Sequence, residues 1–286
     1  MNSILDKFDR AYGYMYASPF AKLIRPGLHK FLFRYWVDRT RRVTPMDANL
    51  FFGGHMRVVL PEVVSRVIYT YGFFDAEVTY LISRYIKPGD TVLDVGAHFG
   101  YVSVLSSHLV GNAGRVYAFE PTPSTFAVLS ENAKSRANIT ALNLGAGKEN
   151  STLDIADYGL QYCAWNTMAD ESRMPTVLAG VSANKVKVKV VNLDDYLAEQ
   201  KIVPSFIKID AENFEADVIA GLTQTIQKAR PIVLMETGSA ASLTAAKSLS
   251  SQGYRPHVVS RPNVVEEWQG SLDEANLRFK DILFLP

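Results

Sequence analysis

Cysteine is almost absent from this chain of 286 residues, and its scarcity limits where the protein works. Cys163 is the only cysteine, so no intrachain disulfide can form. The chain therefore needs no oxidising compartment, and we expect a reducing, cytoplasmic location. The first residues also lack a basic start followed by an apolar run, so they do not predict a secretory signal.

Long apolar runs and a large charge excess are missing as well. No uncharged apolar stretch approaches the roughly 20 residues that span a bilayer. A net charge of +1 argues against a surface tuned to a polyanion, so we expect no nucleic-acid partner. No His/Cys cluster has the spacing of a transition-metal site. Carboxylates at Asp210, Glu212, Glu215 and Glu236 could hold a divalent cation, but helix caps and strand ends also explain them, so we predict no metal.

What the sequence does contain, from residue 91 onwards, is an alternation of short apolar runs and amphipathic stretches. This pattern is typical of βαβ units. It predicts an α/β, Rossmann-like fold with a doubly wound, mostly parallel sheet of seven strands over residues 76–286. The expected strands cover residues 91–97, 115–120, 139–146, 205–210, 231–236, 254–259 and 281–285.

Two segments lie outside this alternation. Residues 1–75 predict an extension of short helices, with a strand pair in 50–60 that turns at Gly53–Gly54. Residues 151–191 begin and end with strand-like runs, but 158–184 has no clear period. We interpret that stretch as a functional loop, since long irregular runs inside compact domains are usually functional.

The main candidate site is the segment Asp94-Val95-Gly96-Ala97-His98-Phe99-Gly100, which ends the first parallel strand and opens the next helix. Ligands of open α/β sheets bind beyond the carboxyl ends of such strands. The glycine pattern is DxGxxxG and not the GxGxxG that admits a pyrophosphate, so a dinucleotide is disfavoured. S-adenosylmethionine (SAM) carries an ammonium and a sulfonium but no phosphate, and an acid beside an approachable backbone suits it better.

Two further acids end neighbouring strands. Glu120 follows the second strand, where a carboxylate can accept hydrogen bonds from both ribose hydroxyls. Asp210 ends the fourth parallel strand and is expected to face the donor methyl group. It could serve as general base for a substrate hydroxyl or as partner of the SAM ammonium. Glu212 and Glu215 are better explained as caps of the following helix.

These segments resemble the FkbM family of methyltransferases, usually O-methyltransferases of sugars and secondary metabolites with the class I fold. Two departures from the family pattern stand out: His98 replaces a usual Asn, and Asn213 replaces a usual Gly. The matching segments are VLDVGAHFGYVSVLSS, GRVYAFEPTPSTFAVLSENA, ITALNLGAGKENSTL, VVNLDDYL, FIKIDAENFEADVIAGL and RPIVLMET.

The resemblance implies a role for individual positions. The methionine end of SAM would be lined by Asp94, Gly96, Ala97, His98, Gly100 and Tyr101, and also by Asp210. The ribose would be held by Glu120, Pro121 and Thr122, with Asn143 and Leu144 flanking the adenine. Glu77 would reach the amino-acid end of the cofactor, although a solvated helix face explains it equally well.

The general base and the acceptor pocket stay open at this point. Candidates for the base are Asp210, His98 and His55, since a histidine titrates near neutrality. The irregular loop offers aromatic and amide side chains that fit a sugar or another polar small molecule: Tyr162, Trp165, Asn166 and Arg173. Two rival functions are a non-catalytic binding scaffold of the same fold and, less favoured, a nicotinamide-dependent oxidoreductase.

Residues 1–42 differ from the rest of the chain. They carry nine Lys or Arg against three Asp, a net charge of +6, together with nine aromatic residues, whereas the remainder carries −5. Basic amphipathic helices bind anionic membranes, so this arm could contact the inner membrane surface, for instance to reach a lipid-linked glycan. A helical cap on the catalytic domain or a homodimer contact explains the same composition, and we prefer that interpretation.

Overall fold

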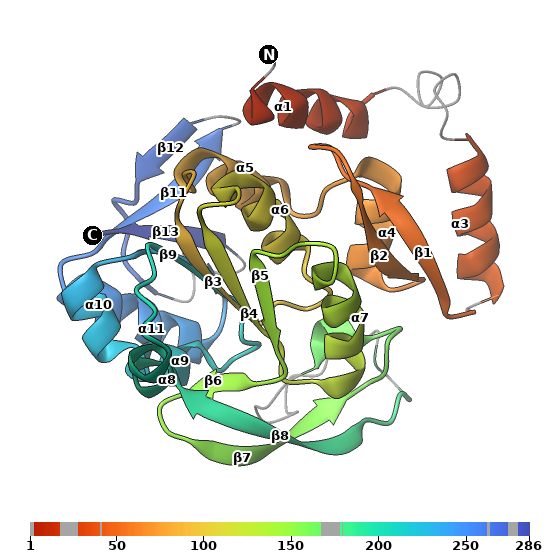
Figure 1. Cartoon of the computed structure of the whole chain (residues 1–286). Coiled ribbons are helices and arrows are strands. Elements are labelled where there is room, and N and C mark those ends of the chain that lie inside the picture. The colour runs from red at the N-terminus through yellow and green to blue at the C-terminus, as the bar shows by residue number, and fades with distance from the viewer. Residues whose placement is uncertain are drawn as a thin grey trace.

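The fold is built around one large sheet, as the alternation of apolar runs predicts. The computed structural model describes residues 3–17, 28–40, 42–166, 178, 180–261, 264–273 and 280–286. Within these ranges an eight-stranded sheet forms the centre of the molecule (Figure 1). Five strands are parallel neighbours, in the order β5 (Ile139–Leu142), β4 (Arg115–Phe119), β3 (Thr91–Val95), β9 (Phe206–Ile209) and β10 (Ile232–Thr237). Antiparallel pairing then adds β13 (Lys280–Leu285), β11 (Arg255–Arg261) and β12 (Val264–Glu267).

The strand order places a topological switch point in the middle of this sheet. From β3 the chain first builds outwards to β4 and β5, and it later returns to add β9 and β10 on the other side of β3. The crossovers therefore leave in opposite directions from β3 and β9, which opens a crevice at the carboxyl ends of these two strands.

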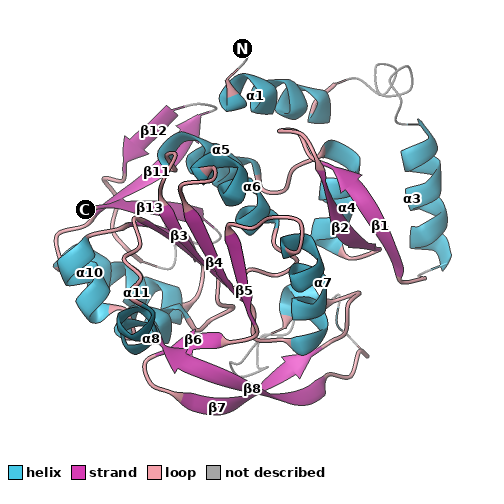
Figure 2. Ribbon diagram, viewed as in Figure 1, coloured by secondary structure: helices cyan, strands magenta, loops and turns pink. Residues whose placement is uncertain are grey.

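Helices cover both faces of the sheet (Figure 2). Val92 of β3 packs into one hydrophobic core, while Leu93 and Val95 pack into the other, because successive side chains of a strand point to opposite faces. The first face carries α5 (Ala76–Tyr85), α6 (Tyr101–Val110) and α7 (Pro123–Ala133). The second carries α8 (Leu193–Gln200), α9 (Glu215–Ala220), α10 (Thr223–Ala229) and α11 (Ala240–Ser251).

The N-terminal segments pack beside the first face. They form α1 (Ile4–Met15), α3 (Leu28–Thr40), a hairpin of β1 (Thr44–Asn49) and β2 (His55–Leu60), and α4 (Val63–Tyr71). Phe8 and Val37 are buried in the same core as Val92, so these helices are held by the α/β layers. The boundary at residue 75 stays a prediction. None of the helices in the described ranges combines the length and apolarity that crossing a membrane requires.

Three strand predictions need correction. The hairpin turns at Gly53 and Gly54 as expected, with φ of 105° and 77°, but its first strand precedes residue 50. Residues 139–146 are two strands, because the chain leaves the large sheet after β5 and pairs again as β6 (Gly145–Gly147). β12 is an eighth strand that the apolar pattern missed, since its residues are largely exposed at the sheet edge.

The two ends of the irregular segment 151–191 belong to a second sheet, which has three strands. β7 (Ser151–Asp157) and β8 (Asn184–Asn192) are antiparallel, and β6 pairs with β8 in parallel. The strand-like runs at both ends of 151–191 are therefore strands, as predicted. Between them lies a short 3₁₀ turn, η1 (Cys163–Trp165), which brings part of the loop toward the crevice.

Candidate active site

A cavity of about 310 Å³ opens at the switch point, beyond the carboxyl ends of β3, β4, β9 and β10. Its walls come from four parts of the chain: the bend after β3, the loop after β4, the segment after β9, and the turn η1. Val63 and Val64, at the start of α4, also line it, as do residues near α5, β6, β10 and β13. The cavity thus occupies the place where a doubly wound sheet binds its ligand.

Gly96 lies where the ends of β3 and β9 come so close together that no side chain fits. Its φ is 76°, and a Cβ atom there would lie 1.7 Å from the carbonyl oxygen of Asp210. The amides of Gly96 and Ala97 both donate to the Phe119 carbonyl at 3.0 Å, which fixes the bend against β4 as well. The glycine is therefore needed first by the protein's own backbone. Gly100 has a similar role, since a Cβ atom there would meet Leu129 of α7 at 2.6 Å.

Asp94 lies fully buried at the end of β3 and lines the cavity. Its Oδ2 accepts a hydrogen bond from the Ser103 hydroxyl at 2.5 Å. Its Oδ1 has no hydrogen-bond partner among the described residues. Burial raises the pKa of Asp94, and Lys208 and Ser103 act in the opposite direction. A buried carboxylate oxygen without a partner is unfavourable, so this atom is suited to accept a hydrogen bond from a ligand or water.

Glu120 is held by backbone amides on both carboxylate oxygens. Oε2 accepts from the His98 amide at 3.0 Å, and Oε1 accepts from the Thr122 amide at 2.9 Å. Burial raises the pKa of Glu120 to about 7, although these two hydrogen bonds lower it. Each oxygen keeps acceptor capacity, so the side chain is fixed in place and still able to bind hydroxyl groups.

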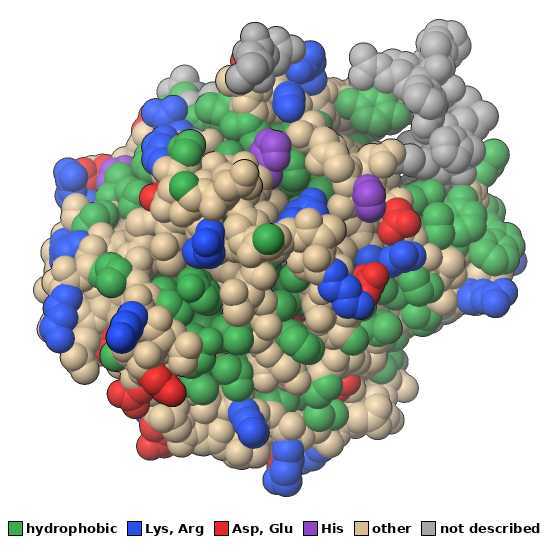
Figure 3. All heavy atoms as spheres, in the orientation of Figure 1, with side chains coloured by type: hydrophobic (Ala, Val, Ile, Leu, Met, Phe, Trp, Pro, Cys, Tyr) green, Lys and Arg blue, Asp and Glu red, His purple; other side chains and the backbone are tan. Residues whose placement is uncertain are grey.

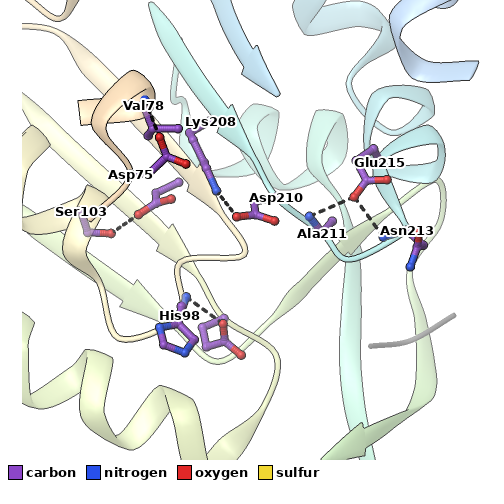
Figure 4. Close-up of polar contacts among 11 residues, drawn as sticks. Asp75, Val78, His98, Ser103, Lys208, Asp210, Ala211, Asn213 and Glu215 are labelled. Atoms are coloured by element: carbon purple, nitrogen blue, oxygen red, sulfur yellow. Dashed lines mark hydrogen bonds and ion pairs between the residues drawn. The ribbon is translucent and has the colours of Figure 1, made fainter. Parts of the chain in front are cut away.

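Lys208 and Asp210 form an ion pair at the end of β9 (Figure 4). The Lys208 ammonium lies 2.6 Å from Asp210 Oδ2, and the lysine side chain is only 7% exposed. Burial favours the neutral form of each group, but the neighbouring opposite charges and hydrogen bonds together have the larger effect. The pKa of Lys208 is therefore raised and that of Asp210 is lowered. Asp210 is therefore ionised at neutral pH and is a weak base, which makes it a stabiliser of positive charge.

Further carboxyl groups surround this pair. Glu212, Glu236 and Asp281 all line the cavity. Burial and the Asp210 carboxylate raise the pKa of Glu212 to about 9 and that of Glu236 to about 8. Burial also raises the pKa of Asp281 well above its ordinary value. Glu212 and Glu236 are therefore largely protonated at neutral pH, so they can donate hydrogen bonds as well as accept them.

Glu215 lies in the first turn of α9, as predicted, but its carboxylate binds the preceding loop and does not cap the helix. Its Oε1 accepts from the amides of Ala211 and Asn213, at 3.3 and 3.1 Å, just before α9. Glu212 differs from this expectation, because it lines the cavity. Within the described ranges, no three His, Cys, Asp or Glu side chains are arranged to hold a metal ion.

His98 connects the cofactor bend to the irregular loop. Its φ is 50°, and its Nε2 lies 3.1 Å from Cys163 Sγ on η1. The Cys163 thiol donates to the Leu160 carbonyl at 3.4 Å, so the consistent tautomer has Nε2–H donating to the sulfur and leaves a lone pair on Nδ1. Burial lowers the pKa of His98, against the effects of Glu62 and Asp210. The ring is therefore neutral at pH 7 and able to accept a proton.

The cavity brings together most of the predicted cofactor and loop residues. Tyr101 lines it from α6, where its hydroxyl bonds Thr79 at 2.9 Å. Asn166 accepts from the Tyr158 amide at 2.9 Å, which ties the loop to the end of β7. The predicted residues that line the cavity are Asp94, Gly96, Ala97, His98, Tyr101, Glu120, Pro121, Thr122, Leu144, Trp165, Asn166 and Asp210.

Several predicted residues lie outside this lining, as formed by the described residues. Glu77 and His55 are exposed, at the starts of α5 and β2. Asn143 donates to the carbonyls of Glu120 and Pro121 at 2.9 and 2.8 Å, so it shapes the loop after β4. Gly100 packs on α7, and Tyr162 stands behind Trp165 with 6.2 Å between their ring centroids. Arg173 lies outside the described residues.

Sequence reasoning missed several cavity residues, among them Asp281, Lys208, Asp75 and Cys163. Lys208 interrupts an apolar strand two residues before Asp210, and the period of two places both side chains on one face, which was a usable signal. Asp75 caps α5 by accepting from the amides of Glu77 and Val78, both at 3.0 Å, and it also lines the cavity. For Cys163 the sequence carried no such signal.

The donor set fits SAM in three respects. Glu120 offers a fixed carboxylate at the end of β4 for the ribose hydroxyls. The unpartnered Asp94 Oδ1 and the ionised Asp210 suit the ammonium and sulfonium charges. Leu144, Ala146 and Phe119 provide an apolar wall for the adenine.

Comparison with known proteins identifies the family of the chain. Residues 94–256, more than half of the chain, match the model of the methyltransferase FkbM domain. A hexuronic acid methyltransferase, AglP, of Haloferax volcanii is 26% identical over 167 residues, 56% of this chain and 61% of that protein. The 31-O-demethyl-FK506 methyltransferase FkbM of Streptomyces tacrolimicus is 31% identical over 159 residues, 48% of this chain and 61% of that protein. The chain thus spans about 61% of the length of each of these relatives.

Solved structures give more distant likenesses. A methyltransferase FkbM from Methylobacillus flagellatus has a TM-score of 0.44 and 16% identity, over 69% of this chain and 43% of that one. Aeropyrum pernix fibrillarin with bound SAM has a TM-score of 0.41 and 14% identity, over 85% and 100%. On the family model and the sheet order together, the chain belongs to the FkbM family of SAM-dependent methyltransferases.

Proposed function

We propose that the chain is an O-methyltransferase that methylates a hydroxyl group of a sugar, a glycan or a related secondary metabolite. The two relatives described above are named for a hexuronic acid and for an oxygen of FK506, which supports an oxygen acceptor on a polyhydroxylated small molecule. Trp165 lines the cavity beside Asn166, and an aromatic ring next to an amide suits a sugar ring and its hydroxyl groups.

The observation that carries the proposal is the convergence of three acids and a neutral histidine on one cavity. Asp94 and Glu120 end β3 and β4, Asp210 follows β9, and His98 lies in the bend between the strands. SAM supplies an activated methyl group on a sulfonium, and transfer to a nucleophile is an in-line displacement. The main task of the protein is alignment, which can contribute roughly 7 to 11 kcal/mol.

His98 is the base that we favour for the acceptor hydroxyl. Its lowered pKa keeps the ring neutral at pH 7 with a lone pair that can accept a proton, whereas Asp210 is held ionised in an ion pair with Lys208. The Nδ1 lone pair of His98 would accept the proton that the acceptor hydroxyl loses as its oxygen displaces the thioether sulfur from the methyl carbon. Asp210 stabilises the positive charge that then develops on the imidazole, since it already acts on the His98 pKa in this direction.

A calorimetric titration and a methyl-transfer assay together test this proposal. We expect SAM to bind and NAD not to bind, because the bend after β3 lacks the pyrophosphate pattern. Incubation of the protein with methyl-labelled SAM and a cell extract, followed by mass spectrometry, should reveal a product labelled on oxygen. SAM binding without any labelled product would indicate a non-catalytic scaffold, and NAD binding would indicate an oxidoreductase.

A further inference from the structure

Helix α3 has two apolar faces, and only one of them is covered by the protein. Val37 is completely buried, and the Phe33 ring lies 6.4 Å from that of Tyr69 on α4. On the other side, Leu32, Tyr35 and Trp36 are 61%, 69% and 46% exposed. Positions i, i+3 and i+4 share one face of a helix, so these three side chains form a single apolar surface, called here the outer face of α3.

This clustering is unusual for the molecule. Three of the eight large hydrophobic side chains that are exposed in the described ranges belong to this one helix, and the others occur singly. Scattered exposed apolar residues are ordinary, but a contiguous patch marks an interaction surface. Hydrophobic side chains gather over α3 at the right edge of the molecule in Figure 3.

The charge of this region is strongly positive. Residues 22–42 contain seven Lys or Arg and one acid, Asp38, so they carry the whole +6 of the first 42 residues. The segment 1–21 is neutral, with Lys7 and Arg10 against two acids. Arg39 is exposed three residues after Trp36, and Arg42 is exposed just beyond the helix. An apolar surface bordered by cations is therefore complementary to an anionic, partly apolar partner.

A second copy of the chain and a nucleic acid both fit less well. A two-fold dimer brings the same patch of both subunits together, so it would oppose two segments of +6. A nucleic acid matches the cations but offers no apolar layer for Leu32. An anionic bilayer satisfies both features, because Trp and Tyr prefer the membrane interface, and lysine and arginine side chains attract acidic headgroups.

We propose that the outer face of α3 docks on an anionic phospholipid bilayer. Leu32, Tyr35 and Trp36 enter the interface, and Arg39 and Arg42 lie among the headgroups. The bilayer would then lie near the active-site cavity, since α4 contacts α3 through Tyr69 and lines the cavity at Val63. These two residues are separated by about 9 Å along the helix axis, at 1.5 Å per residue.

Vesicle co-sedimentation of the full chain tests the proposal. The vesicles contain either phosphatidylcholine alone or equal parts of phosphatidylcholine and phosphatidylglycerol. We expect the chain to pellet only with the anionic vesicles, and to be released by high salt. Substituting all three outer-face residues, Leu32→Ser, Tyr35→Ser and Trp36→Ser, should abolish pelleting, whereas Val203→Ser, which changes an equally exposed residue elsewhere, should not.

A charge variant and a measurement of the oligomeric state complete the test. Arg39→Gln should lower the partition coefficient about fivefold, as expected for one basic residue near an anionic surface. Point substitutions are preferred to deletion of residues 1–42, because Phe8 and Val37 belong to the core. Recovery of the wild-type chain in the supernatant with anionic vesicles would overturn the proposal. A dimer in sedimentation velocity that the triple substitution dissociates, without vesicle binding, would assign the surface to self-association.

Discussion

The two halves of the cavity hold their charges in different ways. In the half at β3 and β4, Glu120 is fixed by backbone amides, and Asp94 keeps one oxygen without a described partner. In the half at β9 and β10, charge is balanced among side chains: Lys208 pairs with Asp210, and raised pKa values keep Glu212 and Glu236 protonated. The first half is organised for one fixed ligand, while the second can redistribute protons around a reacting group.

The largest expected effect concerns the histidine that borders both halves. Substitution of His98 by Asn should lower kcat about 100-fold, because a positioned base contributes about 10²- to 10⁴-fold. Asn tolerates the left-handed backbone at this position, so folding should be preserved. The measurement is the pH dependence of kcat, once an acceptor is known, with His257→Gln, a half-buried residue outside the cavity lining, as control. An unchanged kcat would show that a group other than His98 acts as the base.

Breaking the ion pair should affect stability more than any other change in the β9 half. Lys208→Met leaves the Asp210 charge and its acidic neighbours without a cation, and removal of one partner of a buried pair costs about 3 to 5 kcal/mol. The Asp210 side chain is 34% exposed, so we expect a loss of unfolding free energy at the lower end of this range, about 3 kcal/mol. Urea denaturation measures it. The double variant Lys208→Met/Asp210→Asn should recover part of the loss; if it is less stable than the single variant, the pair is not the cause.

In the β4 half the corresponding change should act on binding. Glu120→Gln removes the charge that accepts the ribose hydroxyls, and hydrogen bonds to charged groups contribute about 1.5 to 3 kcal/mol. The dissociation constant for SAM should therefore rise about 10- to 100-fold. Stability should fall as well, because the NH₂ group of Gln cannot accept from one of the two backbone amides that hold Glu120. Calorimetry on Glu120→Gln and on the exposed control Glu131→Gln checks this. If the two variants bind SAM with equal affinity, the ribose does not bind at Glu120.

A smaller effect should appear as a pH dependence of SAM binding. Burial raises the pKa of Glu120 to about 7, so the carboxyl is protonated below this pH and ionised above it. If the ionised form accepts the ribose, affinity should rise about tenfold from pH 6 to pH 8, and binding at pH 7 should release protons. The same shift makes the contribution of Glu120 to folding stability decrease as pH rises toward 7. Affinity that is flat across this range in the wild-type chain would contradict the assignment.

Sequence patterns predicted the parts of this molecule that depend on local periodicity. The parallel strands, the glycine bend at Gly96 and the acids at strand ends follow from spacing along the chain. Pairing between distant segments does not, so the division of 139–146 between two sheets was missed. The exposed edge strand β12 carried no apolar signal at all.

The same distinction applies to the site residues. For Glu77 the sequence left a cofactor contact and a solvated helix face equally open. Asp75 lines the cavity instead, because the turn before α5 decides which acid faces inwards. The contact between His98 and Cys163 joins residues that are far apart in the sequence, and no single-sequence pattern encodes it. Lys208 could have been found, since a lysine in an apolar strand requires a buried partner.

A crystal soaked with S-adenosylhomocysteine tests the central claim most directly. We predict density in the crevice between Gly96 and Glu120, with the ribose hydroxyls within hydrogen-bond distance of the Glu120 carboxylate and the adenine against Leu144. If the crevice stays empty, or if the nucleoside binds away from Glu120, the assignment of this cavity to the methyl donor is contradicted.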